Sequence, residues 1–161
     1  MGGLNTYGYV GGNALSRVDP LGLATWQGWA RSISLGPFTR EEYDLFSDCI
    51  DDLKQHIKVI VDYGGVSLGA IAQQWYAVFD DHFDYPNAMG FAGPAFSYSA
   101  GAAGIGNAGL PLVGWGASYS RTRIGSAESV GWSVVRGIGA GVGVSVGASS
   151  VEMLPSEKCC D

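Results

Sequence analysis

Residues 113–148 alternate between bulky and small side chains, and this alternation limits what the chain can fold into. In 113–123 and again in 130–148, large residues occupy every second position, and glycine, serine or threonine mostly fill the positions between them. Two residues is the repeat of an extended strand, whose successive side chains point to opposite faces of a sheet. Residues 125–128, Gly-Ser-Ala-Glu, separate the two runs as a hairpin loop does. We therefore expect a Gly-rich antiparallel β meander or barrel.

The same glycines permit a helical alternative. Gly139, Gly143 and Gly147 are four residues apart, and Gly137 and Gly141 form a second such row. This spacing lets membrane helices pack backbone to backbone, so helical hairpins with glycine zippers are the alternative fold. Glycine at nearly every second position produces a four-residue spacing automatically, which leaves strands as the main expectation. Arg136 interrupts the longest apolar stretch, so no ordinary transmembrane helix is expected.

The chain before residue 85 follows a helical pattern instead. Thr39 and Glu42 form a capping box, and Gly64–Gly65 is a typical helix end. Between them the apolar residues recur at steps of three and four, namely Tyr43, Phe46, Ile50, Leu53, Ile57 and Ile60. This pattern predicts a long amphipathic helix over about 40–62. Residues 24–35 are interpreted as a short amphipathic helix or turn. The pattern of residues 66–79 suits a helix or strands, and we favour the helix, so the predicted fold class is α+β, with N-terminal helices before the Gly-rich β part.

Composition limits the class of protein. The 161 residues carry a net charge of −6 and an isoelectric point near 4.7, with only 15% charged residues and 26 glycines. Nucleic-acid binding requires a basic surface, so no nucleic-acid partner is expected. The three cysteines are interpreted as neither a disulfide framework nor a zinc site, with Cys49 in a helix core and Cys159–Cys160 in a solvated tail. We expect no metal and no cofactor.

One short polar cluster has residues suited to catalysis. Asp80, Asp81, His82 and Asp84 lie just before the turn signal Tyr85-Pro86-Asn87. A histidine oriented by a carboxylate can act as a general base or help to hold a divalent cation. A short acidic run at the end of an element is more commonly a solvated cap, so the cluster supports only an alternative function as an enzyme.

The first residues carry a resemblance to a known family. Residues 3–10 read Gly-Leu-Asn-Thr-Tyr-Gly-Tyr-Val, and residues 19–23 read Asp-Pro-Leu-Gly-Leu. This stretch resembles the closing segment of an Rhs/YD-repeat core, and only Gly12 and Ala14 replace the usual Asn and Pro. The resemblance implies that residues 1–23 are the end of such a core. It also implies that residues 24–161 form the variable C-terminal toxin domain.

The resemblance carries further expectations about the junction and the partners. Rhs cores cut themselves after the final Leu, here between Leu23 and Ala24, with two carboxylates of which Asp19 matches one. The second carboxylate belongs to an upstream Asp-Pro unit that this sequence lacks, so we expect no self-cleavage. The implied partners are the Rhs core shell and a cognate immunity protein. The implied destination is a target cell, into which the protein is delivered as a secreted effector.

Three functions remain for the toxin domain, which we divide into a helical part (24–84), a Gly-rich part (85–151) and a tail (152–161). The first is an interbacterial effector that perturbs or permeabilises the target-cell inner membrane, because residues 85–120 contain no charge and strands with one bulky apolar face suit a bilayer. In that case the glycines 137, 139, 141, 143 and 147 form the membrane or packing face. The second is a cytosolic toxin enzyme acting on nucleotides, nucleic acid or protein through Asp81 and His82. The third is a binding module that uses Trp26 and Trp29.

Overall fold

The computed structural model describes residues 24–35, 37–50, 52–68, 71–83, 85–105 and 111–159. Nearly all of them lie in β-strands. The elements are β1 (Thr25–Leu35), β2 (Phe38–Ser47), β3 (Leu53–Leu68), β4 (Ile71–Asp80), the 3₁₀ helix η2 (Ala88–Phe91), β5 (Gly93–Ile105), β6 (Pro111–Ile124) and β7 (Ala127–Lys158). Among these described residues, no helix has the length and hydrophobicity required to cross a membrane.

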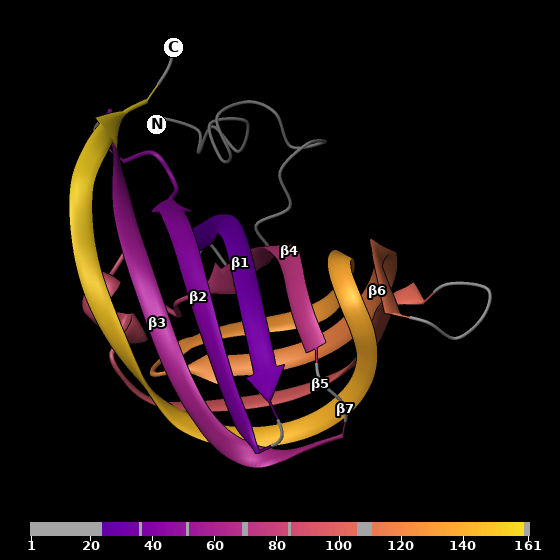
Figure 1. Cartoon of the computed structure of the whole chain (residues 1–161). Helices are drawn as coiled ribbons and strands as arrows, with labels where there is room; N and C mark the ends of the chain where they lie inside the picture. The colour runs from indigo at the N-terminus through magenta and orange to yellow at the C-terminus, as the bar shows by residue number, and fades with distance from the viewer. Residues whose placement is uncertain are drawn as a thin grey trace, which may run out of the picture.

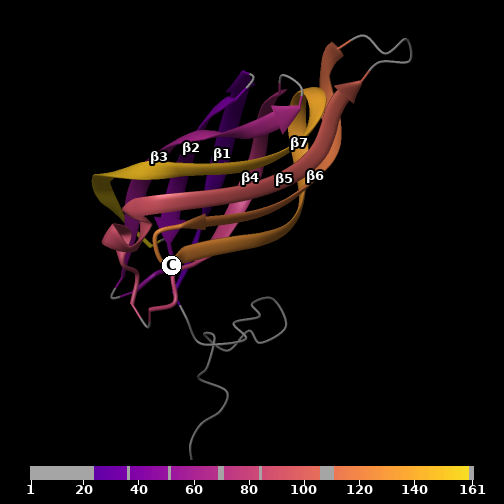
Figure 2. The same cartoon turned by 90° about the horizontal axis from the view of Figure 1, so that it is seen from below.

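The strands close into an eight-stranded antiparallel barrel, because the long strand β7 takes part twice (Figure 1). Its first half pairs with β4 on one side and β6 on the other, and its second half pairs with β5 and β3. The order around the barrel is therefore β3, β2, β1, β4, first half of β7, β6, β5 and second half of β7, which returns to β3. Figure 2 shows the wide bend of β7 between its two halves.

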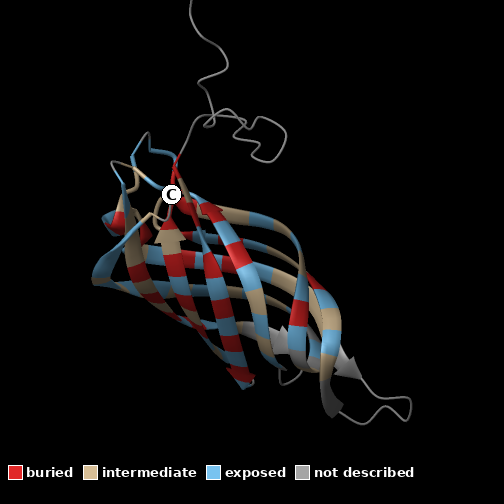
Figure 3. Cartoon of the chain, turned by 90° about the horizontal axis from the view of Figure 1, so that it is seen from above, coloured by how far each residue is buried: buried red, intermediate tan, exposed pale blue. Residues whose placement is uncertain are grey.

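Buried and exposed residues alternate along each strand, as the banded colouring of Figure 3 shows. One half of the lumen is filled by a compact apolar core, in which Trp26, Tyr43, Phe79 and Phe91 make edge-to-face ring contacts. Phe91 comes from η2, which closes this end of the barrel. We call it the closed end. The opposite end, which holds the β1–β2 turn, is called the open end.

The predicted helix over 40–62 is wrong, because these residues form most of β2 and the first part of β3. The inward residues of β3 include Ile57, Val59 and Val61, which repeat every two residues and are β-branched. The expected capping residues serve other roles. Thr39 donates a hydrogen bond to the Ser34 hydroxyl, and Glu42 pairs with Arg31 across the sheet.

The two shorter predicted helices are also wrong. Residues 24–35 contain β1, where Trp26 points inward and Trp29 points outward, so these two side chains do not share a face. The region 66–79 contains the end of β3 and most of β4. The α+β class and the alternative of helical hairpins are therefore replaced by a nearly all-β barrel. The alternating runs 113–123 and 130–148 lie within β6 and β7.

Candidate functional site

The outer surface of β5, β6 and β7 carries many apolar side chains, together with the exposed Arg121, Arg123 and Arg136. Its exposed apolar side chains are Phe96, Tyr98, Trp115, Val130, Trp132, Val134, Val142, Val144 and Val146, which we call the apolar face. Trp115 and Trp132 are 72% and 76% exposed. Strand register places Val146 opposite Phe96 and Val144 opposite Tyr98, so the apolar side chains are neighbours across the strands. An exposed patch of this kind marks an interaction surface.

The inward neighbours of the apolar face are small and polar. Ser97, Ser99, Ser118, Ser120, Ser133 and Ser145 line a cavity in the lumen. A barrel folded for water alone places apolar side chains inside and polar ones outside. In the part of β5–β7 that lines this cavity the arrangement is largely reversed, as it is in barrels that contact lipid, whereas Ala95, Ile124 and Ala127 of the same strands belong to the apolar core.

The outer surface of β1–β3 is charged. Its side chains are Arg31, Arg40, Glu42, Asp44, Lys58 and Asp62, with His56 beside them, and we call it the charged face. The Arg31 Nε atom donates to Glu42 at 2.8 Å, and this hydrogen bond is the main reason that the pKa of Glu42 is lowered. Arg40 is held more loosely, at 3.8 Å from Glu42 and 3.7 Å from Asp62. The barrel is therefore amphipathic around its circumference.

Strand register also shows where the apolar and charged surfaces meet. Leu35, Phe38, Gly64, Val146 and Phe96 are directly opposite one another on successive strands β1, β2, β3, β7 and β5. Because Gly64 has no side chain, this row is apolar from one end to the other. The next row towards the closed end contains Ile33, Arg40, Asp62 and Ala148. The charged groups of β2 and β3 therefore lie one row closer to the closed end than the apolar row. On β6 the apolar row itself continues to the exposed Arg123, which is opposite Phe96.

The lumen holds a buried carboxyl group that sequence reasoning missed. Glu41 accepts a hydrogen bond from the Tyr43 hydroxyl. Desolvation raises the pKa of Glu41, and the nearby Tyr43 and Tyr63 hydroxyls oppose the rise only in part. The Tyr63 hydroxyl and the Gln73 amide nitrogen, which border the same cavity, make no well-formed hydrogen bond with the described residues. The cavity measures about 50 Å³, which is enough for one or two water molecules.

The structure separates the members of the Asp80–Asp84 cluster. Asp81 is fully buried and accepts hydrogen bonds from Trp26 Nε1 at 2.9 Å, Phe83 N at 3.0 Å and Asn87 N at 2.9 Å. Asp80 and His82 are exposed, and Asp84 lies outside the described residues. Asp81 is thus a structural acceptor that joins β1 to the loop before η2. Among the described residues, no three His, Cys, Asp or Glu side chains converge as a metal site requires.

The candidate glycines lie at alternate positions of β7, in register with residues of neighbouring strands. Gly137 is opposite Gln73, Gly139 opposite Ala103 and Gly141 opposite Gly101. A Cβ atom on Gly147 would lie 2.1 Å from the Asp62 carbonyl oxygen, so this glycine permits close approach of β3. Gly143 and Gly147 alternate with Val142, Val144 and Val146, so the bulky residues rather than these glycines form the outer surface.

The junction residues are only partly described. Asp19 and Leu23 lie outside the described residues, whereas Ala24 is buried at the start of the barrel. The Ala24 N–H donates to the Phe83 carbonyl at 2.8 Å, and the Ala24 carbonyl accepts from Asp81 N at 3.2 Å. The chain is thus fixed in the barrel immediately after the expected junction.

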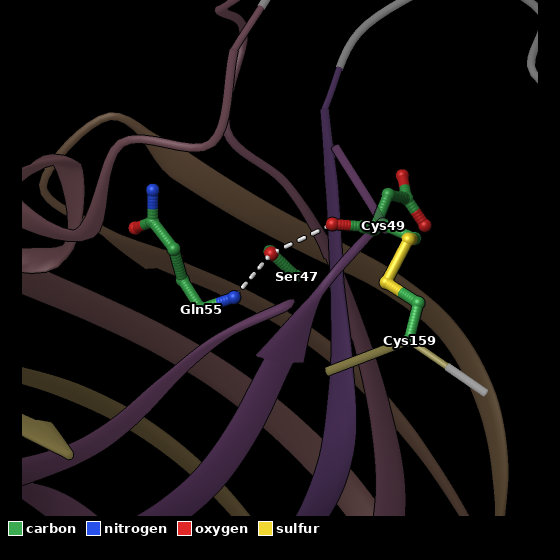
Figure 4. Close-up of a disulfide and its surroundings, with 5 residues drawn as sticks. Ser47, Cys49, Gln55 and Cys159 are labelled. Atoms are coloured by element: carbon green, nitrogen blue, oxygen red, sulfur yellow. Dashed lines mark hydrogen bonds between the residues drawn. A yellow bond between two sulfur atoms is a disulfide. The ribbon is translucent and has the colours of Figure 1, made fainter. Parts of the chain in front are cut away.

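The expectation for the cysteines is corrected by a disulfide between Cys49 and Cys159 (Figure 4). Cys49 follows β2 and Cys159 follows β7, so the bond joins residues 110 positions apart at the closed end. Beside it, the Gln55 N–H donates to the Ser47 hydroxyl at 3.0 Å, which in turn donates to the Asp48 carbonyl at 2.8 Å. Sequence reasoning missed the pair because barrel closure, not sequence spacing, brings the two residues together.

Comparison with known proteins identifies no relative of this barrel: no family model, curated protein or solved structure matches the chain.

Proposed function

We propose that this protein is a membrane-active β-barrel that binds lipid through the apolar face and perturbs the bilayer. The observation that carries the proposal is the reversed arrangement of β5–β7, with valine and aromatic side chains outside and serines inside. Transfer of apolar side chains from water into lipid is favourable, and tryptophan and tyrosine are enriched where membrane and water meet. Trp115, Trp132 and Tyr98 supply such side chains on the apolar face.

The charged face sets the orientation. A cation on the lipid-facing surface of a barrel costs roughly 2–4 kcal/mol at the bilayer midplane and much less near the interface. Arg31, Arg40 and Lys58 all lie on the outer surface of β1–β3. The barrel therefore docks with the apolar face and the tip of the β1–β2 hairpin against lipid. The charged face and the exposed Arg121, Arg123 and Arg136 of β6 and β7 lie at the headgroups or in water.

The resemblance of residues 3–23 to the end of an Rhs core gives this activity a biological role within the proposal. The barrel is then the toxin domain of a secreted effector, with a target-cell membrane as its site of action and an immunity protein as its cognate partner. The Cys49–Cys159 bond supports a route through an oxidising compartment, because disulfides persist there and are rare in the cytosol.

Vesicle flotation and dye leakage test the proposal with two matched variants of β7. Val146→Glu places a charge on the apolar face, whereas Met153→Glu places one outside it at a position of similar exposure, 62% against 67%. We expect Val146→Glu to lower the vesicle partition coefficient about tenfold, since roughly 1–2 kcal/mol is lost by burying the charge. Met153→Glu should bind vesicles and cause dye leakage to the same extent as the wild type. Wild-type protein that stays unbound, or two variants that behave alike, would contradict the proposal.

A further inference from the structure

A groove lies at the border between the apolar and charged surfaces. It has a volume of about 560 Å³, within the range of small-molecule sites. Its lining includes three exposed apolar side chains, Ile33, Leu35 and Phe38, which we call the apolar wall. It also includes Arg31, Arg40, Glu42 and Asp62, together with Ser32, Thr39 and Tyr63. The groove therefore combines an exposed apolar wall with charges of both signs.

The charges in the groove differ in how firmly they are held. Arg31 and Glu42 form a hydrogen-bonded pair, so each side chain is held in place by the other. Arg40 and Asp62 are 3.7 Å apart, with side chains 57% and 68% exposed. An ion pair this long and this exposed contributes little to stability. A ligand that carries a negative and a positive group can therefore replace this ion pair, its negative group binding Arg40 and its positive group binding Asp62.

The apolar wall belongs to the proposed lipid-binding surface. Leu35 and Phe38 begin the apolar row that continues through Gly64 to Val146 and Phe96. Arg40 and Asp62 lie in the next row. If the apolar row is immersed in lipid, these two charges lie at the depth of the lipid headgroups, where long basic side chains extend towards phosphate.

We propose that this groove binds one zwitterionic phospholipid with a primary ammonium headgroup, that is, a phosphatidylethanolamine. Arg40 contacts the phosphate, Asp62 accepts hydrogen bonds from the ammonium, and an acyl chain lies along Ile33, Leu35 and Phe38. A primary ammonium donates three hydrogen bonds, whereas the quaternary ammonium of phosphatidylcholine donates none, so Asp62 distinguishes the two lipids. This inference rests on the membrane binding proposed above and names the lipid that the surface recognises.

The test is binding of the full chain to vesicles of phosphatidylcholine alone and of phosphatidylcholine mixed with phosphatidylethanolamine. We expect the wild type to bind the mixed vesicles several-fold more tightly. Asp62→Asn should lose this preference and still bind phosphatidylcholine, and Arg40→Gln should bind both kinds of vesicle more weakly. Asp44→Asn, on the same charged face but outside the groove lining, is the matched control and should retain the preference.

Two results would overturn the inference. One is a wild type that binds both vesicles equally. The other is a preference that persists in Asp62→Asn, because looser lipid packing rather than a headgroup site would then explain it. Either result leaves the membrane-binding proposal intact, whereas failure of the wild type to bind any vesicle removes that proposal itself. Circular dichroism and the thermal midpoint of each variant establish that it is folded.

Discussion

At the scale of single residues, Glu41 is a carboxyl group whose burial raises its pKa. It is a carboxyl buried in the lumen beside Tyr43 and Tyr63. No sequence pattern identified it, because position 41 stood in the first turn of the helix predicted over 40–62. In the barrel, position 41 falls on the inward side of β2, between Thr39 and Tyr43.

The buried carboxyl predicts a pH dependence of stability. The folded state raises the pKa of Glu41 above the ordinary 4.5, so it binds the proton more tightly than the unfolded chain does. Its contribution to stability is complete below about pH 4.5 and is lost as the pH rises through the folded-state value. Glu41→Gln keeps an acceptor for Tyr43 and has no proton to lose. Urea denaturation from about pH 4 to pH 8 should therefore show that the free energy of unfolding of the wild type declines as the pH rises. Glu41→Gln should lack this decline.

The exposed residue Glu152 supplies the control, and Glu152→Gln should follow the wild-type profile. Parallel profiles for the wild type and Glu41→Gln would show that Glu41 is not the group responsible.

Asp81 and His82 are adjacent in sequence, but their replacement should affect the stability of the barrel differently. Asp81→Ala leaves three donors without their acceptor, from Trp26, Phe83 and Asn87, and should lower the free energy of unfolding by roughly 2–4 kcal/mol. His82 is exposed, so His82→Ala should change the free energy of unfolding by less than about 1 kcal/mol. Denaturant titration of both variants measures the difference. A fully stable His82→Ala protein that has lost toxicity would instead favour the enzyme hypothesis.

At the scale of the elements, the sequence pattern predicts strands correctly where large and small side chains alternate without interruption. Where a helical and an alternating pattern are both present, the prediction of a helix is wrong. The runs in β6 and β7 have a bulky residue at every second position, with no helical pattern of comparable length. In 40–62 the helical series that begins at Tyr43 ends at Ile57 and Ile60, where it overlaps the alternating series Ile57, Val59 and Val61. Pairing with β1 and with β7 favours the strand form, and the sequence of the segment alone does not contain those partners.

Two glycines on neighbouring strands provide a test of strand packing. A Cβ atom on Gly147 would lie 2.1 Å from a backbone oxygen of β3, whereas one on Gly64 would meet nothing within 4 Å. Gly147→Ala should therefore destabilise the barrel by roughly 1–3 kcal/mol through overpacking. Gly64→Ala should be neutral or stabilising by up to about 1 kcal/mol, since alanine restricts the unfolded chain. Thermal unfolding of the two variants checks this, and equal losses would contradict the described register of β3 and β7.

At the scale of the whole molecule, closure of the barrel could not be read from the sequence. It depends on the double use of β7, whose halves pair with four different strands. The same closure brings Cys49 to Cys159 and places β3, on the charged face, beside the second half of β7. The charge-free stretch 85–120 supplies only Phe96, Tyr98 and Trp115 of the apolar face. Which side of each strand faces outward required the structure, and the bulky residues rather than the glycines form that surface.

The most direct test of the central claim is quenching of tryptophan fluorescence by brominated lipids in vesicles. Trp115 and Trp132 lie on the apolar face, whereas Trp26 is buried in the core. We expect strong quenching of the wild type, which is lost when Trp115 and Trp132 are both replaced by phenylalanine and persists in Trp29→Phe. Quenching that is absent from the wild type, or unchanged in the double variant, would contradict contact between the apolar face and lipid.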